Sequence, residues 1–129
     1  MVATVFLVDD NLTFLKAVRG FMKDVPDVRV IGQATRGADA LTRIAQSHPD
    51  LVLLDIGLPD LNGMDVAKTL SVWHQPPQII FLTMYESDGY LEMAQQLGAI
   101  GFVNKADFAD ELPILLAILA TLPSRETCQ

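Results

Sequence analysis

Four short apolar runs in this chain each end at polar side chains, and this repeated pattern constrains the fold more than any other feature. The runs and their polar ends are residues 5–8 before Asp9 and Asp10, 51–54 before Asp55, 79–82 before Thr83, and 99–103 before Lys105. Such runs are typical of strands buried on both faces of a parallel sheet. Ligands of such sheets bind at the carboxyl ends of the strands, where parallel strands meet. Three carboxylates, a hydroxyl and an ammonium are therefore expected in a single site.

Helical periodicity alternates with the strand-like segments along the whole chain. We expect strands at residues 4–8, 28–32, 51–54, 78–82 and 100–103, and helices at 11–24, 37–47, 64–73, 87–97 and 107–122. Asn11 or Asp10 is expected to cap the first helix, and Gly98 to end the fourth. Five βα units with short connections predict an α/β protein with a doubly wound, five-stranded parallel sheet and helices on both faces. The expected topology is the flavodoxin-like (βα)5 order, 2-1-3-4-5.

The last predicted helix is unusually apolar. Its sheet-facing residues are expected at helical spacing, namely Leu112, Leu115, Ile118, Leu119 and Leu122. Ile114 and Leu116 are expected to flank that face, and Pro113 to lie in the first turn, where a missing N–H matters little. Two interpretations stay open: a helix buried more deeply than usual, or an exposed apolar surface for a partner, a second copy or an output domain.

Composition limits the function classes. With 129 residues the chain is long enough for one domain with a substantial core. Its net charge of −7 makes direct binding to nucleic acid phosphates unfavourable. The only cysteine is Cys128, so an internal disulfide is excluded, as is usual in the cytoplasm. We also expect no signal peptide and no membrane span, because the densest apolar stretch is about half the required length.

The polar groups at the predicted sheet edge suit phosphoryl transfer. Asp9, Asp10 and Asp55 would place three negative charges in a small volume, which is unfavourable without a cation, and oxygen ligands favour Mg²⁺ or Mn²⁺. Lys105 and Thr83 supply an ammonium and a hydroxyl for phosphoryl oxygens. Phosphoryl transfer depends mostly on positioning and charge stabilisation. We therefore expect an aspartate to act as the nucleophile.

Five short motifs also occur in a fixed order. They are Val8-Asp9-Asp10, Asp55-Ile56-Gly57-Leu58-Pro59, Asn62-Gly63, Leu82-Thr83 and Gly101-Phe102-Val103-Asn104-Lys105. Each is weak alone, but in this order and spacing the chain resembles the receiver domain of two-component response regulators over nearly its whole length. The resemblance implies a signalling switch rather than an enzyme, with a sensor histidine kinase or a histidine phosphotransfer protein as the phosphoryl donor.

The resemblance also implies a role for each site residue. Asp55 would be the phosphoacceptor. Asp10 would bind Mg²⁺ directly, Asp9 would assist through water, and the backbone carbonyl of Gly57 would complete the ligands. Thr83 and Lys105 would hold the phosphoryl oxygens. Phe102 would turn inward when Thr83 moves.

Domain organisation beyond the receiver is left open by the sequence. Residues 1–122 are expected to form the receiver domain, and residues 123–129 a tail or the start of a linker. A homodimer through the fourth and fifth helices and a DNA-binding output domain outside this chain are both open alternatives. The phrase Leu82-Thr83-Met84-Tyr85 resembles receivers that precede such DNA-binding modules.

Some positions depart from the commonest receiver pattern. Ala106 follows the lysine where many receivers have proline, so a cis-proline turn is not expected there. Phe102 replaces a more frequent tyrosine. Gly57 and Tyr85 occupy the positions that tune access of water to the phosphoryl group.

Three other functions are compatible with parts of this pattern. A phosphatase that forms an aspartyl phosphate needs a second acid where Gly57 stands. A flavodoxin-like cofactor binder needs a phosphate-binding loop after the first strand, where Asp9 and Asp10 would repel an anion. A receiver-like interaction module that no longer takes phosphate stays open.

Overall fold

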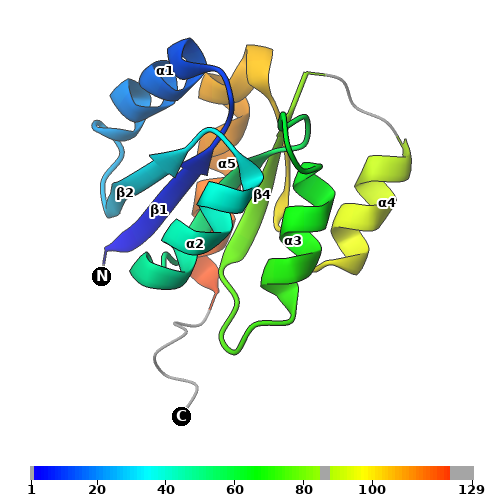
Figure 1. Ribbon diagram of the computed structural model, residues 1–129. Helices are drawn as coiled ribbons and strands as arrows, with labels where there is room; N and C mark the ends of the chain where they lie inside the picture. Colours follow the sequence, from blue (N-terminus) through cyan, green and yellow to red (C-terminus); the bar gives the residue numbers. More distant parts are fainter. Residues whose placement is uncertain (1, 85–87, 123–129) are drawn as a thin grey trace.

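The computed structural model describes residues 2–84 and 88–122, with Asp88 described by its backbone alone. Its strands are β1 (Ala3–Val8), β2 (Val28–Ala34), β3 (Leu51–Asp55), β4 (Gln78–Thr83) and β5 (Gly101–Asn104). Its helices are α1 (Leu12–Met22), α2 (Gly37–Ser47), α3 (Gly63–Ser71), α4 (Asp88–Gln96) and α5 (Phe108–Thr121), and a short 3-10 turn, η1 (Lys105–Asp107), precedes α5. The strands are parallel in the order β2-β1-β3-β4-β5 (Figure 1), which confirms the predicted fold. Tyr85, Ser87 and residues 123–129 lie outside the described residues.

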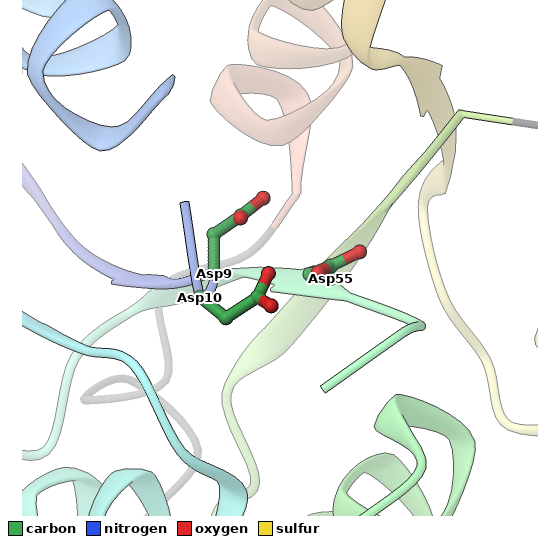
Figure 2. Close-up of side chains that lie close together, drawn as sticks. All are labelled: Asp9, Asp10 and Asp55. Carbon is green, nitrogen blue, oxygen red and sulfur yellow. The ribbon is translucent and has the colours of Figure 1, made fainter. Parts of the chain in front are cut away.

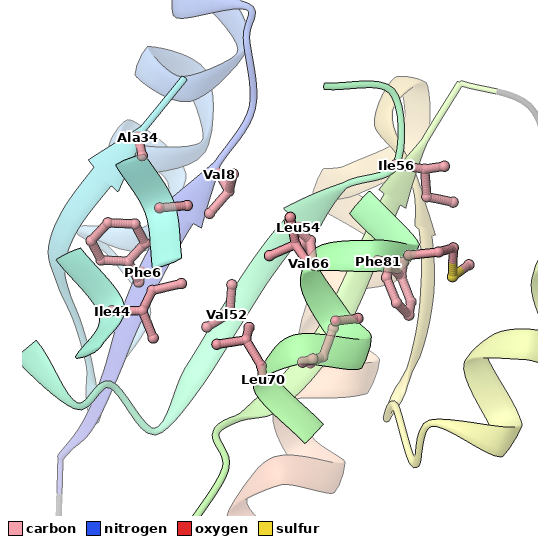
Figure 3. Packing of buried hydrophobic residues seen from close by; sticks show 14 of the residues in the cluster. Phe6, Val8, Ala34, Ile44, Val52, Leu54, Ile56, Val66, Leu70 and Phe81 are labelled. Atoms are coloured by element: carbon pink, nitrogen blue, oxygen red, sulfur yellow. The ribbon is translucent and has the colours of Figure 1, made fainter. Parts of the chain in front are cut away.

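Helices cover both faces of the sheet, and each face has its own core. On one face α2, α3 and α4 pack over side chains such as Phe6, Val52 and Leu54 (Figure 3). On the other, α1 and α5 pack over Leu51 and Leu53. Successive side chains of a strand point to opposite faces. The central strand β3 is therefore buried on both sides, which explains why its sequence is a continuous apolar run.

Caps at the helix ends agree with the sequence signals. The Asn11 side chain accepts a 3.0 Å hydrogen bond from the Phe14 N–H, so Asn11 rather than Asp10 caps α1. Asn62 caps α3 in the same way, through the Met64 N–H at 2.7 Å. Gly98 has φ 75° and follows α4, as expected for a residue that ends a helix.

Two predictions for α5 are wrong. Ile118 and Leu122, predicted to face the sheet, are 43% and 36% exposed, and Leu116, predicted to flank that face, is buried. Leu112, Leu115 and Leu119 do pack against the core, as predicted. In a helix with apolar residues on every side, periodicity alone does not identify the face that contacts the sheet. Pro113 lies inside α5 rather than in its first turn. A proline at this position has no N–H to donate to the carbonyl four residues earlier.

Candidate phosphoacceptor and metal site

The parallel register brings the predicted polar residues to one edge of the sheet. Asp9 and Asp10 directly follow β1, and Asp55 is the last residue of β3. Thr83 ends β4, and Lys105 directly follows β5. Asp55 pairs with Leu82, the residue before Thr83, and Thr83 pairs with Asn104, the residue before Lys105. The five residues predicted for this edge therefore all lie at the carboxyl ends of neighbouring strands.

The three aspartates form a cluster at the carboxyl ends of β1 and β3 (Figure 2). One carboxylate oxygen of each lies within 4.8 Å of the others. Asp9 has no exposed surface and Asp55 is 5% exposed, whereas Asp10 is exposed. Mg²⁺ prefers oxygen ligands and keeps several waters when it binds proteins. A cluster of three carboxylates that is open to solvent at Asp10 fits such a hydrated ion.

Lys105 is the positive charge of this cluster. Its Nζ lies 2.6 Å from Oδ2 of Asp9 and 3.3 Å from Oδ1 of Asp55. The lysine side chain is only 11% exposed, so both ion pairs are largely shielded from water. Backbone N–H groups also hold the carboxylates: Asn11 donates to Asp9 Oδ1 at 2.9 Å, and Gly57 donates to Asp55 Oδ1 at 3.2 Å.

Burial and mutual charge perturb the pKa values of these groups. Burial raises the pKa of Asp55 above its usual value, although the charge of Lys105 partly counteracts this. Burial likewise raises the pKa of Asp9, against the lowering effect of its hydrogen bond to Lys105. Burial alone would lower the pKa of Lys105, but the hydrogen bond to Asp9 and the charge of Asp55 outweigh it, so that pKa is raised. The lysine therefore stays protonated at neutral pH.

Two sets of hydrogen bonds anchor the loop between Asp55 and α3, and the contact made by Asp60 was not predicted from the sequence. The Asp60 carboxylate accepts hydrogen bonds from the N–H groups of Gly37 at 2.7 Å and Ala38 at 3.1 Å, at the first turn of α2. The Gly63 N–H donates to the carbonyl of Ile56 at 2.8 Å. Partners 22 and 23 residues from Asp60 leave no local sequence signal. Together these contacts fix the segment that carries the Gly57 carbonyl.

Aromatic side chains flank the site on both faces of the sheet. On the α4 side Phe102 stacks on Phe81 with ring centroids 5.4 Å apart. On the other side the Lys105 ammonium lies 5.2 Å from the centroid of the Phe14 ring, which contacts Phe108 edge to face. The resemblance to receiver domains implied that Phe102 is a switch residue, whereas no sequence motif indicated a role for Phe14. Its contact with Lys105 depends on how α1 and β5 are placed in space.

Comparison with known proteins gives the family. Residues 5–116 match the response regulator receiver domain family. The chain is 35% identical over 103 residues to a protein-glutamate methylesterase/protein-glutamine glutaminase of Methanosarcina mazei, covering 78% of this chain and 29% of that protein. It is 34% identical over 107 residues to the uncharacterized transcriptional regulatory protein YvfU of Bacillus subtilis, covering 83% of this chain and 54% of that protein.

The solved structures agree. A two-component response regulator of the LuxR family from Aurantimonas sp. SI85-9A1 superposes with a TM-score of 0.84 at 27% identity, covering 93% of this chain and 86% of that chain. The chain therefore belongs to the receiver domain family of two-component response regulators. It spans 29% and 54% of the two relatives named above. Within the described residues no helix is long and apolar enough to cross a membrane.

Proposed function

We propose that this receiver domain is a phosphorylation switch in which Asp55 accepts a phosphoryl group from a phosphohistidine. The donor would be a sensor histidine kinase or a histidine phosphotransfer protein. The observation that carries the proposal is the Lys105 ammonium 3.3 Å from Asp55, in a site that also gathers Asp9 and Asp10. A carboxylate, a cation-binding cluster and an ammonium are the groups that transfer of a phosphoryl group to an aspartate needs.

The proposed transfer is a single displacement at phosphorus. A carboxylate oxygen of Asp55 attacks, a P–O bond forms, and the P–N bond breaks with its electron pair returning to the imidazole. Asp9, Asp10, Asp55 and the Gly57 carbonyl would hold Mg²⁺, or Mn²⁺ in its place. When bound, the ion supplies positive charge that offsets the negative charge of the carboxylates and the phosphoryl oxygens.

The remaining residues would respond to the new charge. Lys105 already contacts Asp55, so it can pair with a phosphoryl oxygen through a small movement. Thr83, buried at the end of β4, would donate its hydroxyl to another oxygen. Phe102 would then leave its present packing and turn inward, changing the surface of α4, β5 and α5. Such a response is a population shift between two states, biased by a local charge.

The partners of this surface are part of the proposal. Helix α5 exposes Ile114 and Ile118, at 65% and 43%, on a segment without charged residues after Glu111. We propose that α4 and α5 form a homodimer interface or contact an output domain that follows residues 123–129. Relatives such as YvfU, named as a transcriptional regulatory protein, favour a DNA-binding output outside this chain. The cytoplasmic location expected from the single cysteine stays a prediction.

Intact-mass spectrometry after incubation with acetyl phosphate and Mg²⁺ tests the switch. We expect one added phosphoryl mass on the wild type and none on Asp55→Ala or after addition of EDTA. Asp24→Ala, which removes an exposed carboxylate from the loop after α1, should label like the wild type. An unlabelled wild type would support the alternative of a phosphate-independent interaction module. The rival phosphatase stays disfavoured, since Gly57 occupies the position of its second acid.

A further inference from the structure

We propose that Glu111 is a positioning residue for Lys105: its carboxylate holds the end of β5 so that the lysine ammonium reaches Asp9 and Asp55. Glu111 lies in the first turn of α5 and is partly buried. Its Oε1 accepts a 2.9 Å hydrogen bond from the backbone N–H of Asn104, the residue before the lysine. A charged acceptor makes this bond stronger than one between neutral groups.

A second hydrogen bond fixes the backbone on the other side of the lysine. The Asn104 side chain accepts from the Ala106 N–H at 2.9 Å and caps the 3-10 turn that begins at Lys105. The backbone N–H groups of both neighbours of Lys105 are therefore held by side chains. With its backbone fixed in this way, the lysine stem is aimed at the acid cluster, where Nζ lies 2.6 Å from Asp9 Oδ2.

The residue after the lysine explains why such anchoring matters in this chain. Ala106 has no ring to restrict its φ, unlike a proline. All described peptide bonds are trans. The shape of the turn at residues 104–106 therefore depends on the hydrogen bonds of Asn104 and Glu111 rather than on a rigid residue.

The Glu111 contact also reaches the neighbouring strand. Asn104, whose N–H it binds, pairs with Thr83 at the end of β4. Glu111 thus ties the first turn of α5 to the strand ends that carry Thr83 and Lys105. A change in Lys105 contacts can be transmitted to α5 through this hydrogen bond.

The first test needs no metal or phosphoryl group. We would record the ¹⁵Nζ ammonium signal of Lys105 in the unphosphorylated protein, assigned with Lys105→Arg, and measure hydrogen exchange of the ammonium with water. Glu111→Ala should speed that exchange by roughly tenfold, because a misplaced ammonium loses its shielded ion pairs. Glu111→Gln keeps a carbonyl acceptor but loses the charge, so its exchange should lie between those of the wild type and Glu111→Ala. Asp110→Ala removes an exposed carboxylate from the same turn and serves as the matched control.

The second test rests on the proposed function and measures phosphorylation of Asp55 by acetyl phosphate. Glu111→Ala should slow labelling by roughly tenfold at saturating Mg²⁺, since small displacements of a catalytic group are enough to do so. Its affinity for Mg²⁺ should not fall, because the three aspartates are untouched and the displaced ammonium competes less with the ion for them. In the Lys105→Ala background, Glu111→Ala should add nothing, as expected if both act through the same group.

Three results would overturn the inference. They are an unchanged rate of ammonium exchange in Glu111→Ala, an equally faster exchange in Asp110→Ala, and slower labelling of Asp55 in the Lys105→Ala/Glu111→Ala double variant than in Lys105→Ala alone. If Glu111→Ala does not fold, Asn104→Ala can be used instead, because it removes the hydrogen bond from the Ala106 N–H to the Asn104 side chain. This variant should show the same faster ammonium exchange, and an exchange rate equal to the wild type would contradict the inference. A wild type that takes no phosphate would refute the proposed function, and the ammonium measurement would still decide the role of Glu111.

Discussion

The ammonium of Lys105 lies 2.6 Å from Oδ2 of Asp9, a carboxylate with no exposed surface. Lys105 is thus part of the folded structure as well as of the proposed chemistry. An ion pair shielded from water matters most when one partner is removed, because the other charge then stays buried without compensation.

Lys105→Ala should lower the free energy of unfolding by about 3 kcal/mol in Mg²⁺-free buffer. Saturating Mg²⁺ should stabilise this variant more than the wild type, since a bound cation would compensate the same carboxylates. Urea titrations with EDTA and with Mg²⁺ measure both effects. Lys68→Ala, at an exposed position on α3, is the control and should change stability by less than about 0.5 kcal/mol. Equal stabilisation of variant and wild type by Mg²⁺ would contradict the prediction.

Asp10→Asn should separate metal binding from folding. Asp10 is exposed, and its charge raises the pKa of Asp55, so its removal relieves repulsion within the cluster. We expect unchanged or slightly higher stability without Mg²⁺, within about 0.5 kcal/mol. Affinity for Mg²⁺ should fall at least about tenfold, because mutation of residues that only hydrogen-bond to metal ligands already weakens metal binding by that factor. Isothermal titration measures the affinity, and a variant that binds Mg²⁺ normally would remove Asp10 from the ligand set.

Gly63→Ala should destabilise the fold, because the added Cβ would meet backbone atoms next to Asp55. A Cβ at Gly63 would overlap the Asp55 carbonyl oxygen and lie 2.7 Å from the Ile56 Cα. Because backbone atoms cannot move aside cheaply, we expect a loss of about 1–3 kcal/mol and slower labelling of Asp55. Gly20→Ala in α1, with open space around its Cβ, should instead stabilise by about 0.5–1 kcal/mol. Denaturation midpoints compare the two, and a neutral Gly63→Ala would show that the loop adapts.

Asp60→Asn should have a pH-dependent effect on stability. Hydrogen bonds from Ala38 and Gly37 lower the pKa of Asp60 in the folded protein. The ionised group therefore stabilises the fold above the unfolded pKa of about 3.9, and this contribution is lost as pH falls through the lower folded pKa. The wild type should exceed the variant in urea midpoint at pH 7, and the gap should shrink below about pH 4. A gap that is independent of pH would mean that the charge of Asp60 is not involved.

Much of the fold was readable from the sequence because its signals are local. Apolar runs identified the strands, and Asn11 and Gly98 marked helix ends as the structure has them. Asp9 and Asp55 each stand at the carboxyl end of a predicted strand. A parallel sheet brings these strand ends to the same edge, so the two residues could be predicted to lie close together. The face of α5 was predicted only in part, because Leu116 and Ile118 are both apolar and hydrophobicity did not distinguish the buried residue from the exposed one.

The amino-acid pattern alone was enough to predict the order of strands and helices and the residue types at the carboxyl edge of the sheet. Three contacts became visible only in the folded protein: Lys105 with Asp9, Asp60 with the start of α2, and Glu111 with Asn104. The periodicity of apolar residues in strands and helices extends over a few neighbouring residues, so it can be read directly from the sequence. Contacts between side chains on separate elements depend on how those elements pack and on how deeply each charge is buried, which no local pattern records.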